Sequence, residues 1–106
     1  MANTYVNAKV DLTTTSATTL YTCAASTTAI VKSIIVSEDS GNADTITLTI
    51  TNGSDVFSLF KTKAVSSNNT LELLSAPLVV QAEEILKVTA ATANRLHVVA
   101  SILEVT

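Results

Sequence analysis

The stretch that decides the fold reads Thr45-Ile46-Thr47-Leu48-Thr49-Ile50-Thr51 and is followed by Asn52-Gly53. Polar and apolar residues alternate strictly along it. Because the side chains of an extended strand point alternately to its two faces, Ile46, Leu48 and Ile50 share one face and the threonines share the other. Threonine is β-branched and suits a half-exposed sheet surface. The stretch therefore predicts a strand with one buried face and indicates an all-β fold.

The same mixture of hydroxyl and aliphatic residues continues along the chain in short segments that are separated by small polar turns. Asn52-Gly53 favours positive φ at both central positions of a type I′ turn, so the segments on either side of it should form a hairpin. Pro77 belongs at a bend or a sheet edge, because it has no N–H for a ladder. Eight or nine short strands with this turn spacing predict an antiparallel β-sandwich. The expected strands are 5–13, 18–23, 29–38, 45–52, 55–62, 70–75, 78–80, 85–90 and 96–105.

Length and composition indicate one compact domain over residues 1–106. The chain has 106 residues, 47% of them hydrophobic, which is enough for a single core. Its formal net charge is −3 and its Lys and Arg residues are scattered, so we expect no direct contact with nucleic acid. The N-terminus lacks the features of a signal peptide, and no stretch approaches the roughly 18 apolar residues of a membrane span. We therefore expect assembly in a cytoplasm and no membrane partner.

No group of residues indicates a catalytic, cofactor or metal site. His97 is the single histidine, and a catalytic role would require a nucleophile or carboxylate beside it, so a surface or interface role is expected. The one cysteine, Cys23, lies in a strand-like segment and is expected in the core. The acidic segment 38–44 does not match the EF-hand spacing, so it predicts a solvated turn instead of a calcium site. The sequence therefore predicts no enzyme, no cofactor and no metal.

Two expected strands are apolar on both faces. Strict alternation in 29–38 places Ile30 and Ile35 on opposite faces, so this strand should lie inside a sheet or under another subunit. In 96–105, four residues are expected in the core: Leu96, Val98, Ala100 and Ile102. The opposite face of that strand, which includes Val99, is more apolar than open solvent requires. Excess apolar surface on a small domain usually indicates a partner.

Three segments follow one another along almost the whole chain: TLYTCAASTTAIVKSIIV at 19–36, LELLSAPLVVQA followed by EILKV at 71–88, and LHVVASILE at 96–104. Together they resemble small virion structural proteins of tailed bacteriophages. Two positions depart from the family pattern. Ala24 stands where the pattern has proline, and Glu83-Glu84 stands where it has Gly-Asp. The second departure puts in doubt the tight turn before 85–90.

The resemblance implies a non-enzymatic building block with a jelly-roll-like β-sandwich. The favoured function is a capsid decoration or cement protein that binds the outer shell of the virion and stabilises adjacent capsomers. Implied partners are the major capsid protein and further copies of the chain, as a homotrimer. Tyr5 and Val6, in a candidate N-terminal arm of residues 1–8, are expected to contact the capsid or a sister subunit. His97, Val99 and Leu103 are expected near the trimer axis.

Two alternatives stay open. A tail, neck or fibre-associated adaptor of the virion would use the same sandwich. A carbohydrate-binding module would need exposed aromatic platforms, and the only aromatic residues are Tyr5, Tyr21, Phe57 and Phe60. The spacing of Phe57 and Phe60 predicts opposite faces of a strand, with at least one of the two rings buried.

Overall fold

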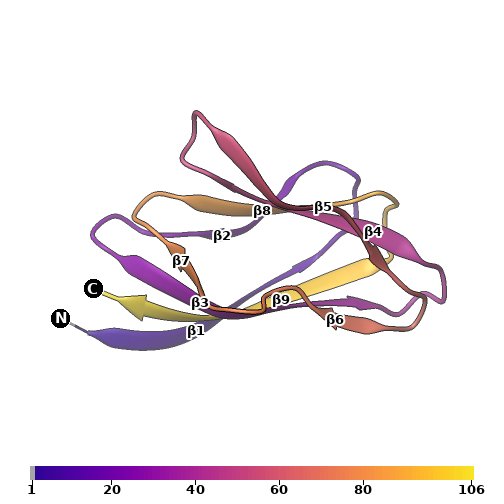
Figure 1. The fold of residues 1–106 in the computed structure, drawn as a ribbon, viewed down its shortest axis with the longest axis horizontal. Coiled ribbons are helices and arrows are strands. Elements are labelled where there is room, and N and C mark those ends of the chain that lie inside the picture. The colour runs from indigo at the N-terminus through magenta and orange to yellow at the C-terminus, as the bar shows by residue number, and fades with distance from the viewer. Residues whose placement is uncertain (1) are drawn as a thin grey trace.

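The computed structural model describes residues 2–106, which form nine strands in two antiparallel sheets packed face to face (Figure 1). The strands are β1 (Asn3–Asp11), β2 (Thr18–Thr22), β3 (Thr28–Glu38), β4 (Asp44–Thr51), β5 (Val56–Val65), β6 (Thr70–Glu72), β7 (Leu78–Val80), β8 (Ile85–Ala90) and β9 (Leu96–Val105). The predicted bounds differ from these by at most three residues. The all-β class and the sandwich are confirmed. Within residues 2–106, no helix is long and apolar enough to cross a membrane.

The strand order is that of a jelly roll. One sheet runs β1-β9-β3, with β6 and β7 both paired to β3, and the other runs β2-β8-β4-β5. β6 pairs with residues 35–37 of β3 and β7 pairs with residues 29–31, so Pro77 lies in the break between them. If β6 and β7 are counted as one interrupted strand and the resulting eight strands are renumbered in chain order, the strand orders of the two sheets become 1-8-3-6 and 2-7-4-5. This is the eight-strand jelly-roll arrangement, with the first and last strands side by side.

β4 has the predicted buried face, but the turn that follows it differs from the prediction. Ile46 and Leu48 are fully buried in the core. The hairpin to β5 is present, yet residues 52–55 form a four-residue connection, and only Gly53 has a positive φ, of 101°. The side-chain oxygen of Asn52 accepts hydrogen bonds from the backbone N–H groups of Ser54 and Asp55, both at 3.0 Å. These two bonds stabilise the longer loop in place of a type I′ turn.

A β-bulge in β3 corrects the predicted alternation. The pairing of β3 with β9 shifts between Val31 and Ser33, which leaves Lys32 as the extra residue. The buried residues change parity at this point: Ala29 and Val31 before it, Ile34 and Val36 after it. Ile30 and Ile35 therefore lie on the same outer face, and not on opposite faces as alternation predicts. β3 is central in its sheet, as expected, with β9 on one side and β6 and β7 on the other.

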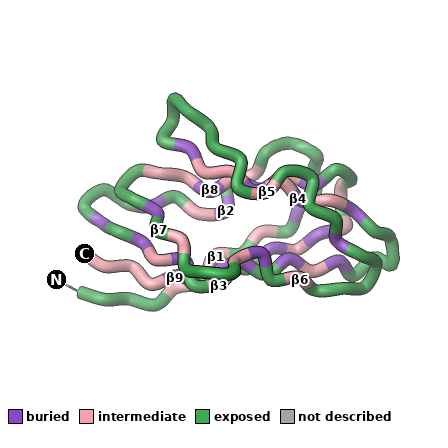
Figure 2. The backbone as a smooth tube through the Cα atoms, viewed as in Figure 1, coloured by how far each residue is buried: buried purple, intermediate pink, exposed green. Residues whose placement is uncertain are grey.

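A second bulge, in β5, corrects the predicted placement of the two phenylalanines. Phe60 pairs with Leu48 and Phe57 pairs with Ile50, so Leu59 is skipped and both rings point to the core side of the sheet. Phe60 packs against the core. Phe57 stays exposed, because the start of β5 belongs to a hairpin that stands away from the rest of the sandwich (Figures 1 and 2).

One cluster of buried apolar side chains fills the space between the sheets, and it includes Cys23, as predicted. Residues 3–8 of the candidate arm belong to β1, which pairs with β9 from Asn3 to Asp11; Met1 lies outside the described residues. Beyond that ladder, Ala2 and Thr106 exchange two backbone hydrogen bonds, at 3.2 and 2.9 Å. The two ends of the described chain therefore lie side by side (Figure 1).

The turn before β8 is present although Glu83-Glu84 replaces the Gly-Asp of the family pattern. Glu83 has φ of 69°, in the left-handed region that favours glycine. Its N–H donates to the carbonyl oxygen of Cys23 at 2.8 Å, and the N–H of Glu84 donates to that of Gln81 at 3.1 Å. The Glu84 carboxylate accepts from the N–H of Gln81 at 2.7 Å. These hydrogen bonds hold the turn without the glycine.

Candidate interaction surface

The outer face of the β1-β9-β3 sheet carries two rows of apolar side chains, together called the apolar face here. The first row crosses four strands through directly paired residues: Tyr5 on β1, Leu103 on β9, Ile30 on β3 and Val79 on β7. Tyr5 is 74% exposed and Val79 is 52% exposed. Large side chains at paired positions on one face contact each other. The row therefore forms a continuous apolar strip across the sheet.

The second row lies further along β1, β9 and β3 and ends on β6 instead of β7. Val99 and Ile35 pair at its centre and are 40% and 39% exposed. Lys9 pairs with Val99 on one side, and Glu72 pairs with Ile35 on the other. The apolar centre is therefore bordered by charged groups at both sheet edges, which is the usual layout of a protein-binding surface.

The structure brings together four of the five residues expected at an interface. Tyr5, Val99 and Leu103 belong to the apolar face, and His97 lies on the same side of the sheet, at its end. Val6 points to the opposite side and packs, half-buried, against the core. Their role at an interface stays a prediction.

Sequence reasoning missed three members of this surface: Ile30, Ile35 and Val79. The bulge at Lys32 places the first two on one face, and the short strand β7 adds Val79. The apolar character of both faces of 29–38 was the signal for them.

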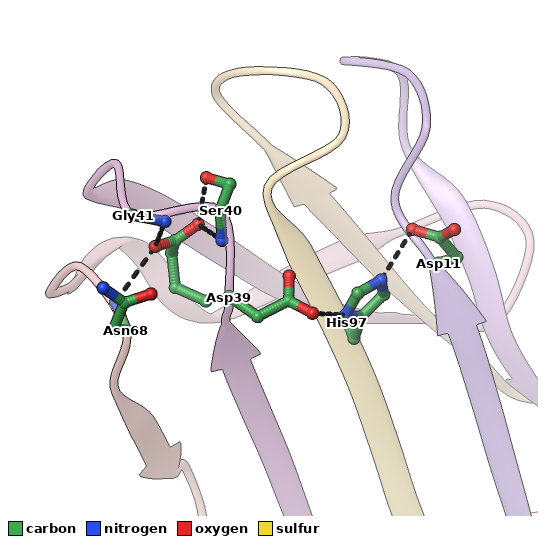
Figure 3. Close-up of polar contacts among 7 residues, drawn as sticks. Asp11, Asp39, Ser40, Gly41, Asn68 and His97 are labelled. Atoms are coloured by element: carbon green, nitrogen blue, oxygen red, sulfur yellow. Dashed lines mark hydrogen bonds and ion pairs between the residues drawn. The ribbon is translucent and has the colours of Figure 1, made fainter.

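His97 lies between two carboxylates at the end of the apolar face (Figure 3). Its Nε2 is 3.2 Å from Oδ1 of Asp11, and its Nδ1 is 3.5 Å from Oδ2 of Asp39. Asp11 ends β1 and Asp39 begins the loop after β3, so the imidazole links three segments. All three side chains are substantially exposed, and such pairs contribute about 0–1 kcal/mol. In the described residues, no hydroxyl or thiol is hydrogen-bonded to His97 as a nucleophile would be.

Glu38, which precedes Asp39 in the chain, holds two loops together through its hydrogen bonds to Ser40, Gly41 and Asn68, the residues labelled beside it in Figure 3. Its buried carboxylate accepts the backbone N–H groups of Ser40 at 2.8 Å, Gly41 at 3.1 Å and Asn68 at 3.1 Å, together with the Ser40 hydroxyl. Burial by itself raises the pKa of Glu38, but these donors outweigh it and lower the pKa to about 2. The carboxylate is therefore ionised. Both of its oxygens accept hydrogen bonds from the two loops, which leaves them unavailable as ligands for a cation.

Glu72 plays a similar part at the rim of the apolar face. Its carboxylate accepts the Ser33 hydroxyl and the backbone N–H groups of Ile34 and Leu74, at 2.9 and 3.1 Å. Desolvation by itself raises the pKa of Glu72, and these donors reverse the effect and lower it. The bulge that aligns Ile30 with Ile35 is therefore held by a side chain from the neighbouring strand.

A hydrogen bond also links the two sheets. The Tyr21 hydroxyl on β2 donates to Oε2 of Glu104 on β9 at 2.5 Å. Burial and the neighbouring Glu104 carboxylate raise the pKa of Tyr21 well above its ordinary range. The Tyr21 hydroxyl therefore keeps its proton and remains the donor of this hydrogen bond. No group of three or more His, Cys, Asp or Glu residues that could hold a metal ion occurs in residues 2–106.

Comparison with known proteins bears on the fold. No protein-family profile and no curated protein sequence matches the chain. Among solved structures, it is similar to a protein of Bacillus endospore appendages, which are disulfide-linked pili: the TM-score is 0.55 at 16% identity, over 100% of this chain and 91% of that one. An identity this low establishes the shared β fold and nothing about function.

Two further similarities are weaker. A pentameric capsid protein from metagenomic phage sequences gives a TM-score of 0.48 at 19% identity over 93% of this chain, which spans 60% of that protein. Eiger TNF from S. frugiperda gives 0.46 at 13% identity, over 96% of this chain and 85% of that one. These two similarities establish neither family nor function.

Proposed function

We propose that this protein is a non-enzymatic structural protein of a virion, and specifically a decoration or cement protein on the capsid of a tailed bacteriophage. The observation that carries the proposal is the apolar face, where exposed apolar side chains from four neighbouring strands adjoin one another and are bordered by charged groups. The resemblance of segments 19–36, 71–88 and 96–104 to small virion proteins supplies the particular setting.

The size of the apolar face fits a weak contact repeated many times. Four strands about 4.8 Å apart span about 14 Å, and four residues along a strand add about 13 Å. The apolar centre therefore covers roughly 200 Å², against about 800 Å² per partner in a standard interface. The polar rim would supply the remaining area. A modest contact suffices here, because copies arrayed over a shell act together.

The partners in this proposal are the major capsid protein and further copies of the chain. A homotrimer would bring His97, Val99 and Leu103 near its axis, while Tyr5 and Val6 would contact the capsid or a sister subunit. Assembly would take place in the host cytoplasm, and the mature location would be the outer capsid surface. Binding stabilises the shell because the intact lattice offers the site and the ruptured lattice does not.

Other functions receive less support. The pilus protein of similar fold comes from disulfide-linked pili, but the single cysteine here, Cys23, is buried, so a disulfide-linked polymer is disfavoured. A carbohydrate platform would need neighbouring exposed rings, whereas Tyr5 and Phe57 lie on different sheets. A tail, neck or fibre adaptor would use the same surface, and only its position in the particle distinguishes it.

The deciding experiment is a cryo-electron-microscopy reconstruction of the particle that carries this protein. We expect density on the outer shell at threefold or quasi-threefold positions. Density confined to the tail or neck would replace the decoration function by the adaptor, and absence from the particle would refute both.

Binding of variants to capsids that lack the protein tests the surface itself. The double variant Val99→Thr, Ile35→Thr keeps β-branched side chains at both positions, so it should stay folded, and it should bind at least tenfold more weakly than wild type. Phe57→Ser, on the other sheet, is the matched control and should bind normally. Equal binding by all three proteins would contradict a role for the apolar face.

A further inference from the structure

Three of the four edges of this sandwich are built in ways that discourage pairing with another strand. β2 is a five-residue strand with a register shift, and β6 and β7 have three residues each with Pro77 between them. β5 carries register shifts, two lysines and Thr62 at φ of 49°, which distort its ladder. Bulges, lysine, proline and short length are the devices by which natural sheets block edge-to-edge association.

The fourth edge, β1, carries only one of these devices, Lys9, and has no bulge and no proline. It runs for nine residues, and its register with β9 is unbroken from Asn3 to Asp11. It contains neither proline nor glycine, and its residues are exposed or half-buried (Figure 2). A long, regular and open edge is a template for an added strand.

The hydrogen bonds at the chain ends show which groups of β1 are free. Ala2 and Thr106 exchange both of their backbone bonds, and the Leu12 N–H donates to Leu96 at 3.0 Å. Bonded and non-bonded pairs alternate in an antiparallel ladder, so the even-numbered residues of β1 bond to β9. The odd-numbered residues therefore direct N–H and C=O to the open edge: Asn3, Tyr5, Asn7, Lys9 and Asp11. Within residues 2–106, β1 pairs with β9 alone, so no second ladder occupies these groups.

We propose that β1 pairs antiparallel with β1 of a second copy of this chain, across a two-fold axis at Asn7. This register pairs all nine residues of both strands. Moving the two-fold axis by one residue in either direction would leave two residues of each strand unpaired. It places Asn7 opposite Asn7 of the second copy and Tyr5 opposite Lys9, and the ammonium group can then lie over the ring. Asp11 meets Asn3, so no like charges face each other.

The inner face of the joint is also self-complementary. Val6 comes opposite Ala8 of the second copy, and both are half-buried in the single chain. The contact closes at two copies, because β1 has only one open edge. It goes beyond the proposed function, since it uses the backbone edge and leaves the centre of the apolar face open.

Disulfide trapping tests the register. In Asn7→Cys, the two thiols would sit on an opposed pair about 5.5 Å apart between Cα atoms, within reach of a disulfide. In the control Lys9→Cys, they would be offset by four residues, about 13 Å. Under mild oxidation we expect a linked dimer from Asn7→Cys and none from Lys9→Cys, with Cys23 buried in both. No linked dimer from Asn7→Cys, or equal amounts from both variants, would overturn the inference.

A second pair of variants tests the backbone contact by light scattering. Asn7→Pro removes an outward N–H and leaves the ladder to β9 intact, whereas Asn7→Ala keeps that N–H. We expect Asn7→Pro, checked as folded by circular dichroism, to have half the mass of Asn7→Ala. Equal masses would overturn the edge contact. If both variants had a mass of three times 11.1 kDa, the edge contact would be overturned and the trimer of the proposed function would be retained.

Discussion

Replacing Glu83 by glycine should make this protein more stable. Glu83 holds φ of 69° in the turn before β8, and its side chain is exposed. The backbone hydrogen bond from its N–H to Cys23 does not depend on the side chain, so glycine keeps it. The substitution therefore removes the steric cost of the left-handed backbone and little else.

The expected gain follows from two opposing terms. An L-residue in the left-handed region costs about 1–2 kcal/mol, and glycine has no such cost. Glycine loses about 0.5–1 kcal/mol more backbone entropy on folding. The difference is a stabilisation of about 0.5–1 kcal/mol, which for a domain of this size raises the unfolding midpoint by about 2–8 °C.

Thermal and urea unfolding at one fixed protein concentration would measure the gain. Glu83→Gln is the matched control, because it removes the same charge and keeps the strained backbone. Glu84→Ala should lose about 1 kcal/mol, since it deletes the acceptor for the Gln81 N–H. The reasoning fails if Glu83→Gly is no more stable than Glu83→Gln.

Three further substitutions test the fold and its electrostatics. Glu38→Gln should lower the free energy of unfolding at neutral pH and flatten its pH dependence. A carboxyl whose pKa is lowered in the folded state stabilises the protein above its ordinary pKa of about 4.3, and this stabilisation is lost as the pH falls toward 2. Urea midpoints of the variant and the wild type that run parallel from pH 6 to 2.5 would argue against this. Leu48→Ala should cost about 2–5 kcal/mol in urea unfolding, as a cavity in a packed core does, while the exposed Phe57→Ala should change little. Tyr21→Phe should cost about 1 kcal/mol by removing the donor to Glu104, and an unchanged midpoint would show that this bond adds nothing.

The sequence predicts the strands well because their signal is local. The alternation of 45–51 marks the buried face of β4 without any knowledge of its neighbours, and Pro77 marks the interruption between β6 and β7. The order of the strands in the sheets is not local. It depends on which distant segments pair, and the sequence supplied it only through a resemblance.

The bulges in β3 and β5 explain why the sequence assigned some side chains to the wrong face of a strand. An extra residue at Lys32 or Leu59 has no distinctive composition, yet each bulge reverses the faces of the residues that follow it in the strand, up to any further bulge. This is why Ile30 and Ile35 were separated in the prediction and why Phe57 and Phe60 were too. The turn at Gly53 was misjudged for a related reason: Asn52 uses its side chain to cap a longer loop, which the dipeptide alone does not reveal.

The position of β9 determines when this molecule can fold. β9 is synthesised after the other eight described strands, but it lies between β1 and β3. At about 5–20 residues per second, the 58 residues from Glu38 to Leu96 take about 3–12 s to make, and during that time β3 has no partner along one side. The nascent chain must therefore keep a strand that is apolar on both faces from aggregating until β9 emerges.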